Sequence, residues 1–247
     1  MNEDDRTKLD QDLRDAGRLP LQGWWADLYE IAPATLQRLQ ALLAAAGGDK
    51  PIFGTSQSLI WVVIDAVVAH LFPSGLQTHM RGAMEEGASP EAVMEALEIA
   101  AEVSSCGYEI GLPVLAEVAR ELGLDEPWLD AGSTGSGELW ERYAGALSPD
   151  YLAALRGLAS ARRDKTVLEP KMRELLFVAG YGCPAIAHSA GLKRHARRAI
   201  EAGATLSEVT TMLRLSNAIG VHSLVVGMRA GADELRAFQA RVPVAAE

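Results

Sequence analysis

The sequence predicts an all-α protein made of two tandem repeats. Apolar residues recur at steps of three and four along most of the chain, and no segment keeps the strict alternation of a strand between turn signals. The chain also aligns with itself without a gap when it is shifted by 116 positions. Glycine and proline residues separate the helical segments of both halves. Each half is therefore predicted to be one helical domain.

The self-alignment extends over nearly all of both halves, so a chance match is a poor explanation. It pairs Trp24 with Trp140 near the start of each repeat, and His79 with His195 near the middle. Other matched positions are Pro33 with Pro149, Leu59 with Leu175, Gly75-Leu76 with Gly191-Leu192, and Gly87-Ala88 with Gly203-Ala204. The predicted repeats span residues 24–122 and 140–247. An N-terminal helical arm is predicted for residues 1–23, and a linker, rich in glycine and serine at its centre, for 123–139.

The second repeat begins its most informative stretch with an apolar helix that contains a carboxylate. Pro170 suits the first turn of this helix, Glu174 lies within it, and Pro184 is expected to end it. The apolar positions at helical spacing are Leu175, Leu176, Val178 and Ala179. A glutamate on such a helix is a candidate acid or base, because burial raises the pKa of a carboxyl group.

A second helix is predicted to carry two histidines on one face. His188 and His195 are seven residues apart, which is close to two helical turns. Gly203 ends this helix, and Thr205 with Glu208 forms a capping box for a third helix that runs towards His222.

Composition excludes several classes of function. A formal net charge of −10 argues against nucleic-acid binding, which needs a clustered basic surface. The two cysteines, Cys106 and Cys183, are too far apart for a disulfide framework or a CxxC pair. The charged N-terminus is no secretory signal, and the longest apolar runs are shorter than the ~20 residues that cross a bilayer. A cytoplasmic protein is expected.

Residues 192–209 resemble the carboxymuconolactone decarboxylase family, whose pattern is Leu-x-x-His, then Ala, Gly-x-Thr and Glu-Ile/Val. The matching residues include Leu192, His195, Gly203, Thr205 and Glu208-Val209. The segment Lys171-x-Arg173-Glu174-Leu175 is similar to the other motif of the family. The resemblance covers both repeats, and the second repeat carries the better match.

This resemblance implies an alkylhydroperoxidase-like helical fold and a decarboxylase without metal or organic cofactor. The family often forms rings of six single-domain subunits, so a fused duplicate implies a homotrimer. The related peroxidases carry Cys-x-x-Cys-x-x-x-His, and their two cysteine positions fall on His188 and Gly191 here. Thiol peroxidase chemistry is not expected, because it needs two neighbouring sulfurs.

Three residues are predicted to be catalytic: Glu174, His195 and His188. Each also has a structural interpretation that the sequence leaves open. Glu174 could pair with a nearby arginine, either Arg173, Arg194 or Arg197, while His195 could be a core histidine and His188 a surface one.

Tyr181, His222 and Arg194 are predicted to bind substrate, and no metal site is expected, since histidines four apart are absent. In the first repeat Ser58 replaces Glu174 and Phe72 replaces His188. That repeat is predicted to have a degenerate site.

The predicted function is a cofactor-independent lyase, a decarboxylase of a small carboxylated lactone or related unsaturated acid. Two alternatives stay open. One is an isomerase or hydrolase of a lactone or specialised metabolite that uses the same residues. The other is a helical oligomer or ligand-binding protein without catalysis. Predicted partners are limited to the small carboxylate or lactone and further copies of the chain.

Overall fold

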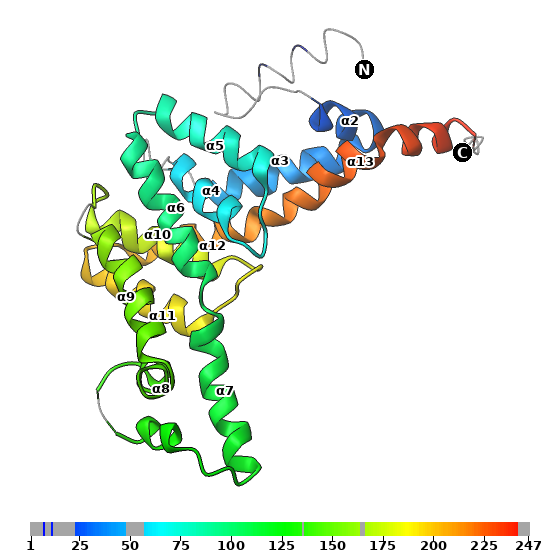
Figure 1. Cartoon of the computed structure of the whole chain (residues 1–247). Coiled ribbons are helices and arrows are strands. Elements are labelled where there is room, and N and C mark those ends of the chain that lie inside the picture. The colour runs from blue at the N-terminus through cyan, green and yellow to red at the C-terminus, as the bar shows by residue number, and fades with distance from the viewer. Residues whose placement is uncertain are drawn as a thin grey trace. The chain divides into compact units, whose positions relative to one another are not determined.

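The computed structural model describes residues 7, 11, 23–47, 57–134, 136–163 and 166–241, and all regular elements within these ranges are helices (Figure 1). The all-α prediction is confirmed. The N-terminal arm predicted for residues 1–23 lies almost entirely outside the described residues.

The helices occur twice in the same order. The first set is α2 (Trp24–Ile31), α3 (Pro33–Gly47), α4 (Gln57–Ala66), α5 (Pro73–Glu85), α6 (Pro90–Ser104) and α7 (Gly107–Glu121). The second is α8 (Leu139–Leu147), α9 (Pro149–Arg163), α10 (Pro170–Gly182), α11 (Ser189–Glu201), α12 (Leu206–Asn217) and α13 (Val221–Gln239). Two 3₁₀ helices, η2 (Pro127–Gly132) and η3 (Ala218–Gly220), precede α8 and α13. Helices α3, α5 and α6 begin 116 residues before α9, α11 and α12, in agreement with the self-alignment of the sequence.

A rare backbone conformation recurs at the same place in both halves. Leu71, between α4 and α5, has φ 31°, and Ala187, between α10 and α11, has φ 47°. Positive φ is uncommon for residues other than glycine. One hydrogen bond closes each turn: Phe72 N–H to the Asp65 carbonyl at 2.9 Å, and His188 N–H to the Tyr181 carbonyl at 3.2 Å. Matching strained turns support an origin by duplication.

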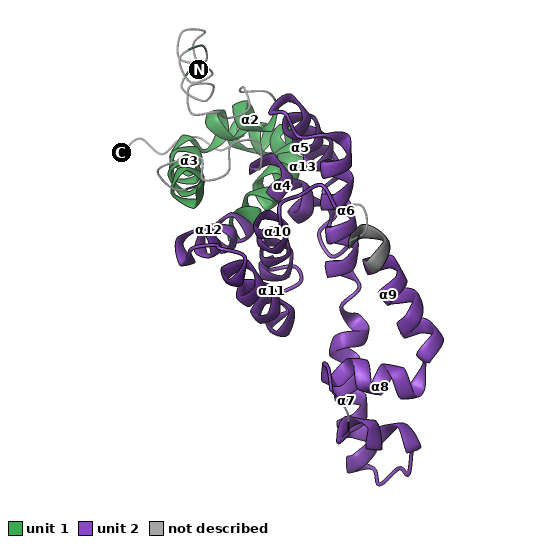
Figure 2. Cartoon of the chain, turned by 90° about the vertical axis from the view of Figure 1, so that its left-hand side faces the viewer, with its two compact units in different colours: residues 1–50, 217–247 green, residues 51–216 purple. Residues whose placement is uncertain are grey.

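The chain forms two compact units that cut across the predicted repeats (Figure 2). Unit 1 comprises residues 1–50 and 217–247, and unit 2 comprises residues 51–216. Unit 1 thus joins the first helices of one repeat to the last helix of the other. The repeat boundaries remain a prediction about sequence, because packing groups the helices differently.

In unit 1, helix α2 packs against α13. Trp24 and Trp25 of α2 are buried, with their rings stacked and their centroids 4.0 Å apart. Arg236 near the end of α13 pairs with Asp27 and Glu30 of α2. Aromatic burial and these ion pairs together hold the two helices, which lie far apart in the sequence.

In unit 2, the core is built on α4 and α10, which pack on each other and on α6. Both carry runs that are buried on every side, Leu59–Ile60 with Val62–Ile64 in α4 and Leu175–Ala179 in α10. A helix that is apolar all round belongs in the centre of a core. Gly180 lets α10 approach α6 closely, since a Cβ at this position would lie 2.9 Å from the Val103 side chain of α6.

The first half of the predicted linker is packed against α8. Trp128 and Leu129 of η2 are buried, and the Trp128 ring meets Tyr143 edge-on at 5.4 Å. Arg120 of α7 donates to the Leu129 carbonyl at 3.1 Å and to the Tyr143 hydroxyl at 2.8 Å. This cluster holds α8 against α7, and both helices line the cavity of the candidate site described below.

By length and composition alone, one run of the described residues, Leu206–Gln239, could cross a membrane. Half of its apolar window is buried within the protein. Core helices of soluble proteins give the same signal, so this run is weak evidence for a membrane span.

Candidate active site

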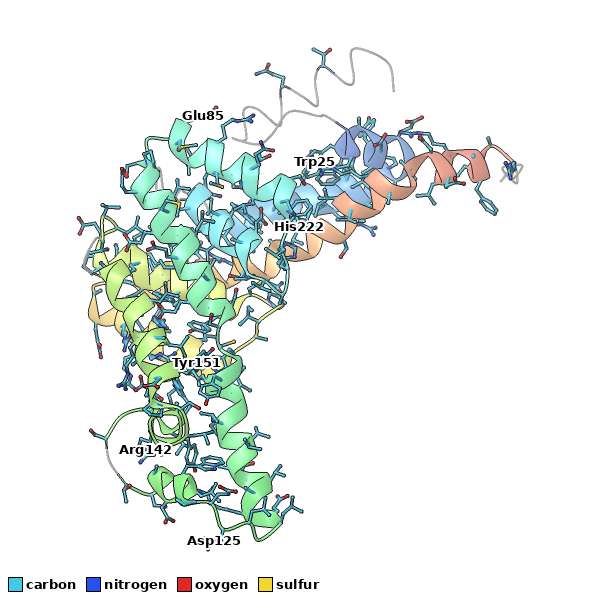
Figure 3. The ribbon with its side chains drawn as sticks, viewed as in Figure 1. Trp25, Glu85, Asp125, Arg142, Tyr151 and His222 are labelled. Atoms are coloured by element: carbon cyan, nitrogen blue, oxygen red, sulfur yellow. The ribbon has the colours of Figure 1, made fainter. Side chains whose placement is uncertain are left out.

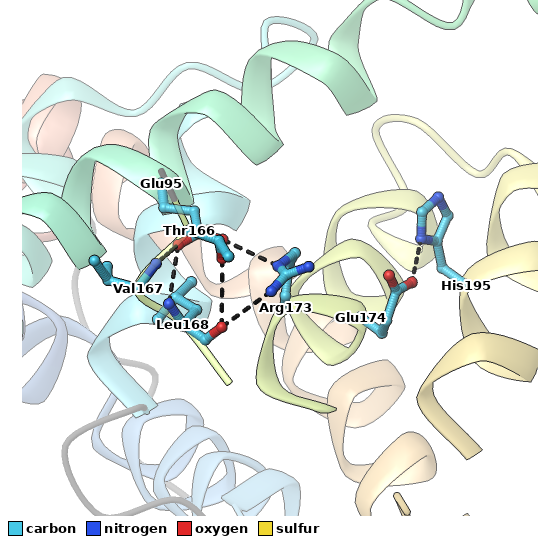
Figure 4. A network of polar contacts seen from close by, with 7 residues as sticks. All are labelled: Glu95, Thr166, Val167, Leu168, Arg173, Glu174 and His195. Carbon is cyan, nitrogen blue, oxygen red and sulfur yellow. Dashed lines mark hydrogen bonds and ion pairs between the residues drawn. The ribbon is translucent and has the colours of Figure 1, made fainter. Parts of the chain in front are cut away.

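Glu174 and His195 form a hydrogen-bonded pair between α10 and α11 (Figure 4). The Glu174 Oε2 atom lies 2.7 Å from His195 Nδ1, and the side chains are 16% and 3% exposed. A carboxylate only accepts, so Nδ1 carries the proton and donates to Glu174. The other nitrogen, Nε2, is left as the ring atom that can act on a ligand.

Two of the three arginines that could have paired with Glu174 are bound elsewhere. Arg173 Nε lies 3.1 Å from Glu95 Oε1. Arg194 makes a two-pronged ion pair with Glu109, at 2.8 Å and 3.2 Å. Glu174 is therefore available to His195, and the salt-bridge interpretation for Arg173 and Arg194 does not describe this structure.

Glu95 anchors the start of α10. Its carboxylate accepts from the Thr166 hydroxyl at 2.6 Å and from the backbone N–H groups of Val167 and Leu168 at 2.8 Å and 3.0 Å, besides pairing with Arg173 (Figure 4). The carboxylate ties α6 to the loop and the first turn that precede Glu174.

Replacing Glu95 by alanine should lower the free energy of unfolding by about 3–5 kcal/mol, because it leaves a half-buried guanidinium and several donors without their acceptor. Denaturant titration measures this change. Glu98→Ala, one turn along the same helix at an exposed position, is the matched control and should change stability little. Equal losses in both variants would contradict the anchoring role.

An aromatic stack holds the His195 ring. Phe177 lies parallel to it, with centroids 4.1 Å apart and planes at 20°, and Tyr181 follows at 5.4 Å and 21°. Burial lowers the pKa of His195, the hydrogen bond and charge of Glu174 raise it, and Arg194 and Arg198 lower it, with a net decrease. The imidazole is thus neutral at neutral pH and its Nε2 can act as a base.

The pH–rate profile should therefore bend below pH 6.5, the ordinary histidine pKa, because the protonation state of His195 changes there. In Glu174→Gln the midpoint should move lower still, since the carboxylate that raises the pKa is lost. Titration of the His195 ring by NMR gives the same quantity without a substrate. An upward movement in Glu174→Gln would contradict this assignment of charges.

His188 caps α11 instead of lying within it. The helix begins at Ser189, and His188 Nδ1 accepts a hydrogen bond from Gly191 N–H at 3.3 Å. The predicted helix placed His188 on the same face as His195, but the strained turn at Ala187 starts α11 later. His188 is buried and does not line the cavity described next, so a catalytic role for it remains only a prediction.

A cavity of about 280 Å³ adjoins His195 in unit 2. Three pairs of elements line it, and Glu174 lies outside the lining, behind the histidine. Helices α10 and α11 supply Tyr181, Arg194, His195 and Arg198. Helices α6 and α7, with the turn between them, supply Glu98, Glu102, Cys106 and Glu109 among others. Helices α8 and α9, with the residue before α8, supply Glu138, Trp140, Glu141, Leu155 and Arg156 among others. The first repeat therefore contributes a wall to the site of the second, which the sequence did not predict.

Two of the predicted substrate-binding residues line this cavity. Tyr181 is buried, and burial together with the Glu109 charge raises the pKa of its phenol well above the usual range, so it stays a hydrogen-bond donor. Arg194 lies 5.9 Å from the centroid of the Tyr181 ring, with its guanidinium held by Glu109 and 3.9 Å from Glu138. His222 is buried at the start of α13 in unit 1 and is not a lining residue, so its predicted role stays a prediction (Figure 3).

Cys106 lines the cavity, although the sequence offered no reason to place it there. Burial and the Glu109 charge raise the pKa of its thiol, which keeps it protonated and a poor nucleophile. Cys106→Ser should therefore leave turnover nearly unchanged. Activity should likewise survive treatment with N-ethylmaleimide, because a buried, protonated thiol reacts slowly with the reagent. Loss of turnover in folded Cys106→Ser would instead indicate thiol chemistry.

The first repeat keeps the histidine and its aromatic neighbour but changes the acidic partner. His79 stacks on Trp61 at 5.6 Å and 20°, as His195 stacks on Phe177. Ser58, at the position of Glu174, donates to Glu86 at 2.8 Å. Asp65, at the position of Tyr181, approaches His79 instead, with Oδ2 3.9 Å from Nε2.

Asp65 and His79 have shifted pKa values of opposite sense. Burial raises the pKa of Asp65 to about 8 and lowers that of His79 to about 4. His70 is also near, with Nε2 3.8 Å from Asp65 Oδ1. At neutral pH this is a neutral carboxylic acid beside neutral imidazoles.

Comparison with solved structures relates this arrangement to a known class. The chain is similar to the crystal structure of a "putative gamma-carboxymuconolactone decarboxylase subunit" from Burkholderia xenovorans LB400, with a TM-score of 0.77 and 26% sequence identity. The match covers 96% of this chain and 98% of that one. No family model matches the chain, and no curated protein does.

The helical fold and this match over the full length define the class. The chain belongs to the carboxymuconolactone decarboxylase and alkylhydroperoxidase-like superfamily, as the resemblance of residues 192–209 predicted.

Proposed function

We propose that this protein is a cofactor-independent lyase that decarboxylates a small carboxylated lactone or related unsaturated acid. The observation that carries the proposal is the hydrogen-bonded Glu174–His195 pair, whose buried histidine lines a cavity of about 280 Å³. That volume suits a molecule of one ring with few substituents. The similarity to a protein described as a decarboxylase subunit supports the same class of reaction.

In the proposed reaction the bond between the ring carbon and the carboxylate breaks, and its electron pair moves into a conjugated carbonyl to form a dienolate. The Tyr181 hydroxyl, kept protonated by burial and lining the cavity, would donate to the developing oxyanion. His195 Nε2 takes one proton from solvent and delivers it to the carbanionic carbon, and Glu174 orients and stabilises the protonated ring. One CO₂ leaves and one proton is consumed in each turnover.

The pair also supports a second candidate, isomerisation of a lactone. A neutral imidazole with its Nδ1 proton bound to a carboxylate is a general base, which suits proton abstraction next to a carbonyl. The same residues would then return the proton to a different carbon without loss of CO₂.

A single experiment separates these reactions. A panel of carboxylated unsaturated lactones is incubated with the enzyme in D₂O and followed by NMR, with CO₂ measured in parallel. Decarboxylation gives one CO₂ per substrate and deuterium at the carbon that lost it, whereas isomerisation gives exchange without CO₂, and hydrolysis gives an open-chain acid. His195→Ala is the control for background reaction. No conversion of any substrate would favour the ligand-binding alternative.

A further inference from the structure

Three arginines line the cavity, and two of them are engaged. Arg194 is held by Glu109 in the two-pronged ion pair described above. Arg156 Nη2 lies 3.3 Å from Glu141 Oε1. Both cations are already compensated, so a ligand carboxylate would have to compete with a bound glutamate. The predicted role of Arg194 in substrate binding is weakened for this reason.

Arg198 is the third arginine of the cavity and has a different environment. It follows His195 by three residues on α11, so both side chains lie on one face of the helix and line the same cavity. No ion pair or hydrogen bond joins its side chain to another residue in the described part of the chain. Its charge acts on His195, where it contributes to the lowered pKa of the ring.

The rest of the lining is acidic. Five glutamates face the cavity, Glu98, Glu102, Glu109, Glu138 and Glu141, against the three arginines. A ligand anion would be repelled over most of this surface and attracted on the side of Arg198. The charge distribution therefore favours one orientation for an acidic ligand, with its anionic group beside Arg198 and its ring near His195 and Tyr181.

From this charge distribution we infer that Arg198 binds the carboxylate of the ligand in this cavity, and that the first repeat lacks an equivalent cation. The equivalent position of the first repeat is Gly82, which offers no charge. The inference rests on the proposed function in taking the ligand to be a small organic acid. An ion pair stabilises an anion relative to neutral CO₂ and would oppose loss of the carboxylate that it holds. The substrate would therefore carry a second carboxylate, which Arg198 binds and the product keeps.

Binding of a simple probe tests this without turnover. Furan-2-carboxylate is ionised at neutral pH, and furan-2-carboxamide is its neutral counterpart of nearly the same shape. Affinities of both are measured by calorimetry or ligand-observed NMR for the wild type, Arg198→Gln and Arg197→Gln. Arg197 is the matched control, because it is exposed on the same helix and does not line the cavity.

The expected result is a carboxylate affinity about 10- to 100-fold lower in Arg198→Gln, in line with the loss of a charge-assisted hydrogen bond, with carboxamide affinity little changed. Arg197→Gln should bind the carboxylate as the wild type does. Equal carboxylate affinity in Arg198→Gln, equal losses in both variants, or no binding to the wild type at about 10 mM would each overturn the inference.

Failure of this inference and failure of the proposed function give different results. Carboxylate binding that depends on Arg198, with no CO₂ released from any acid, would leave the inference standing and remove the decarboxylase. CO₂ release, together with a furan-2-carboxylate affinity that is unchanged in Arg198→Gln, would support the decarboxylase and overturn the inference.

Discussion

Replacing His195 by alanine is expected to lower turnover by ~10²-fold or more, the size of effect seen when a general acid–base group is removed. The residue's Nε2 is the ring atom free to act in the cavity, because Nδ1 is bound to Glu174 at 2.7 Å. Turnover is measured as CO₂ release under saturating substrate. Circular dichroism and thermal unfolding establish that the variant is folded.

His79→Ala is the matched control for this experiment. His79 occupies the equivalent position and the same kind of aromatic stack, but its acidic partner is a buried aspartate. Its loss should affect stability more than turnover. Equal losses of turnover in the two variants would mean that both repeats are catalytic or that both histidines are structural, and either result would contradict a single site per chain.

Replacing Asp65 by asparagine is expected to stabilise the protein at neutral and alkaline pH by several kcal/mol. The pKa of Asp65 is raised by burial from 3.8 to about 8, so the folded state holds this proton far more tightly than the unfolded chain. Between these values the unfolded state ionises and the folded state does not, which lowers the stability of the wild type by ~1.4 kcal/mol for each pH unit. Asparagine does not titrate, so the Asp65→Asn variant does not lose this stability as the pH rises.

Thermal unfolding between pH 4 and pH 9 checks the prediction. The difference in melting temperature between Asp65→Asn and the wild type should be smallest at pH 4, increase up to about pH 8 and then level off. Asp125→Asn is the control, because Asp125 is exposed and should give no such trend (Figure 3). A constant difference across the range would show that Asp65 is ionised throughout.

Much of the fold could be predicted from the sequence, because the signals involved are local. The spacing of apolar residues and the positions of proline and glycine indicate helices through contacts between residues three or four apart. The self-alignment at 116 positions anticipated the repeated helix starts and paired His79 with His195. The catalytic candidates Glu174 and His195 followed from their place in a family motif, and the structure places them within hydrogen-bonding distance.

The identity of each charged partner was decided only by the tertiary structure. Glu174 pairs with His195 because Arg173 is held by Glu95, 78 residues away, and Arg194 by Glu109, 85 residues away. The strained turn at Ala187 made His188 a helix cap, and packing of α6 and α7 against the second repeat gave the cavity its acidic wall. Periodicity in a sequence reports which face of a helix is buried, but ion pairs and cavity walls depend on which helices meet, and that is set by the packing of the whole core.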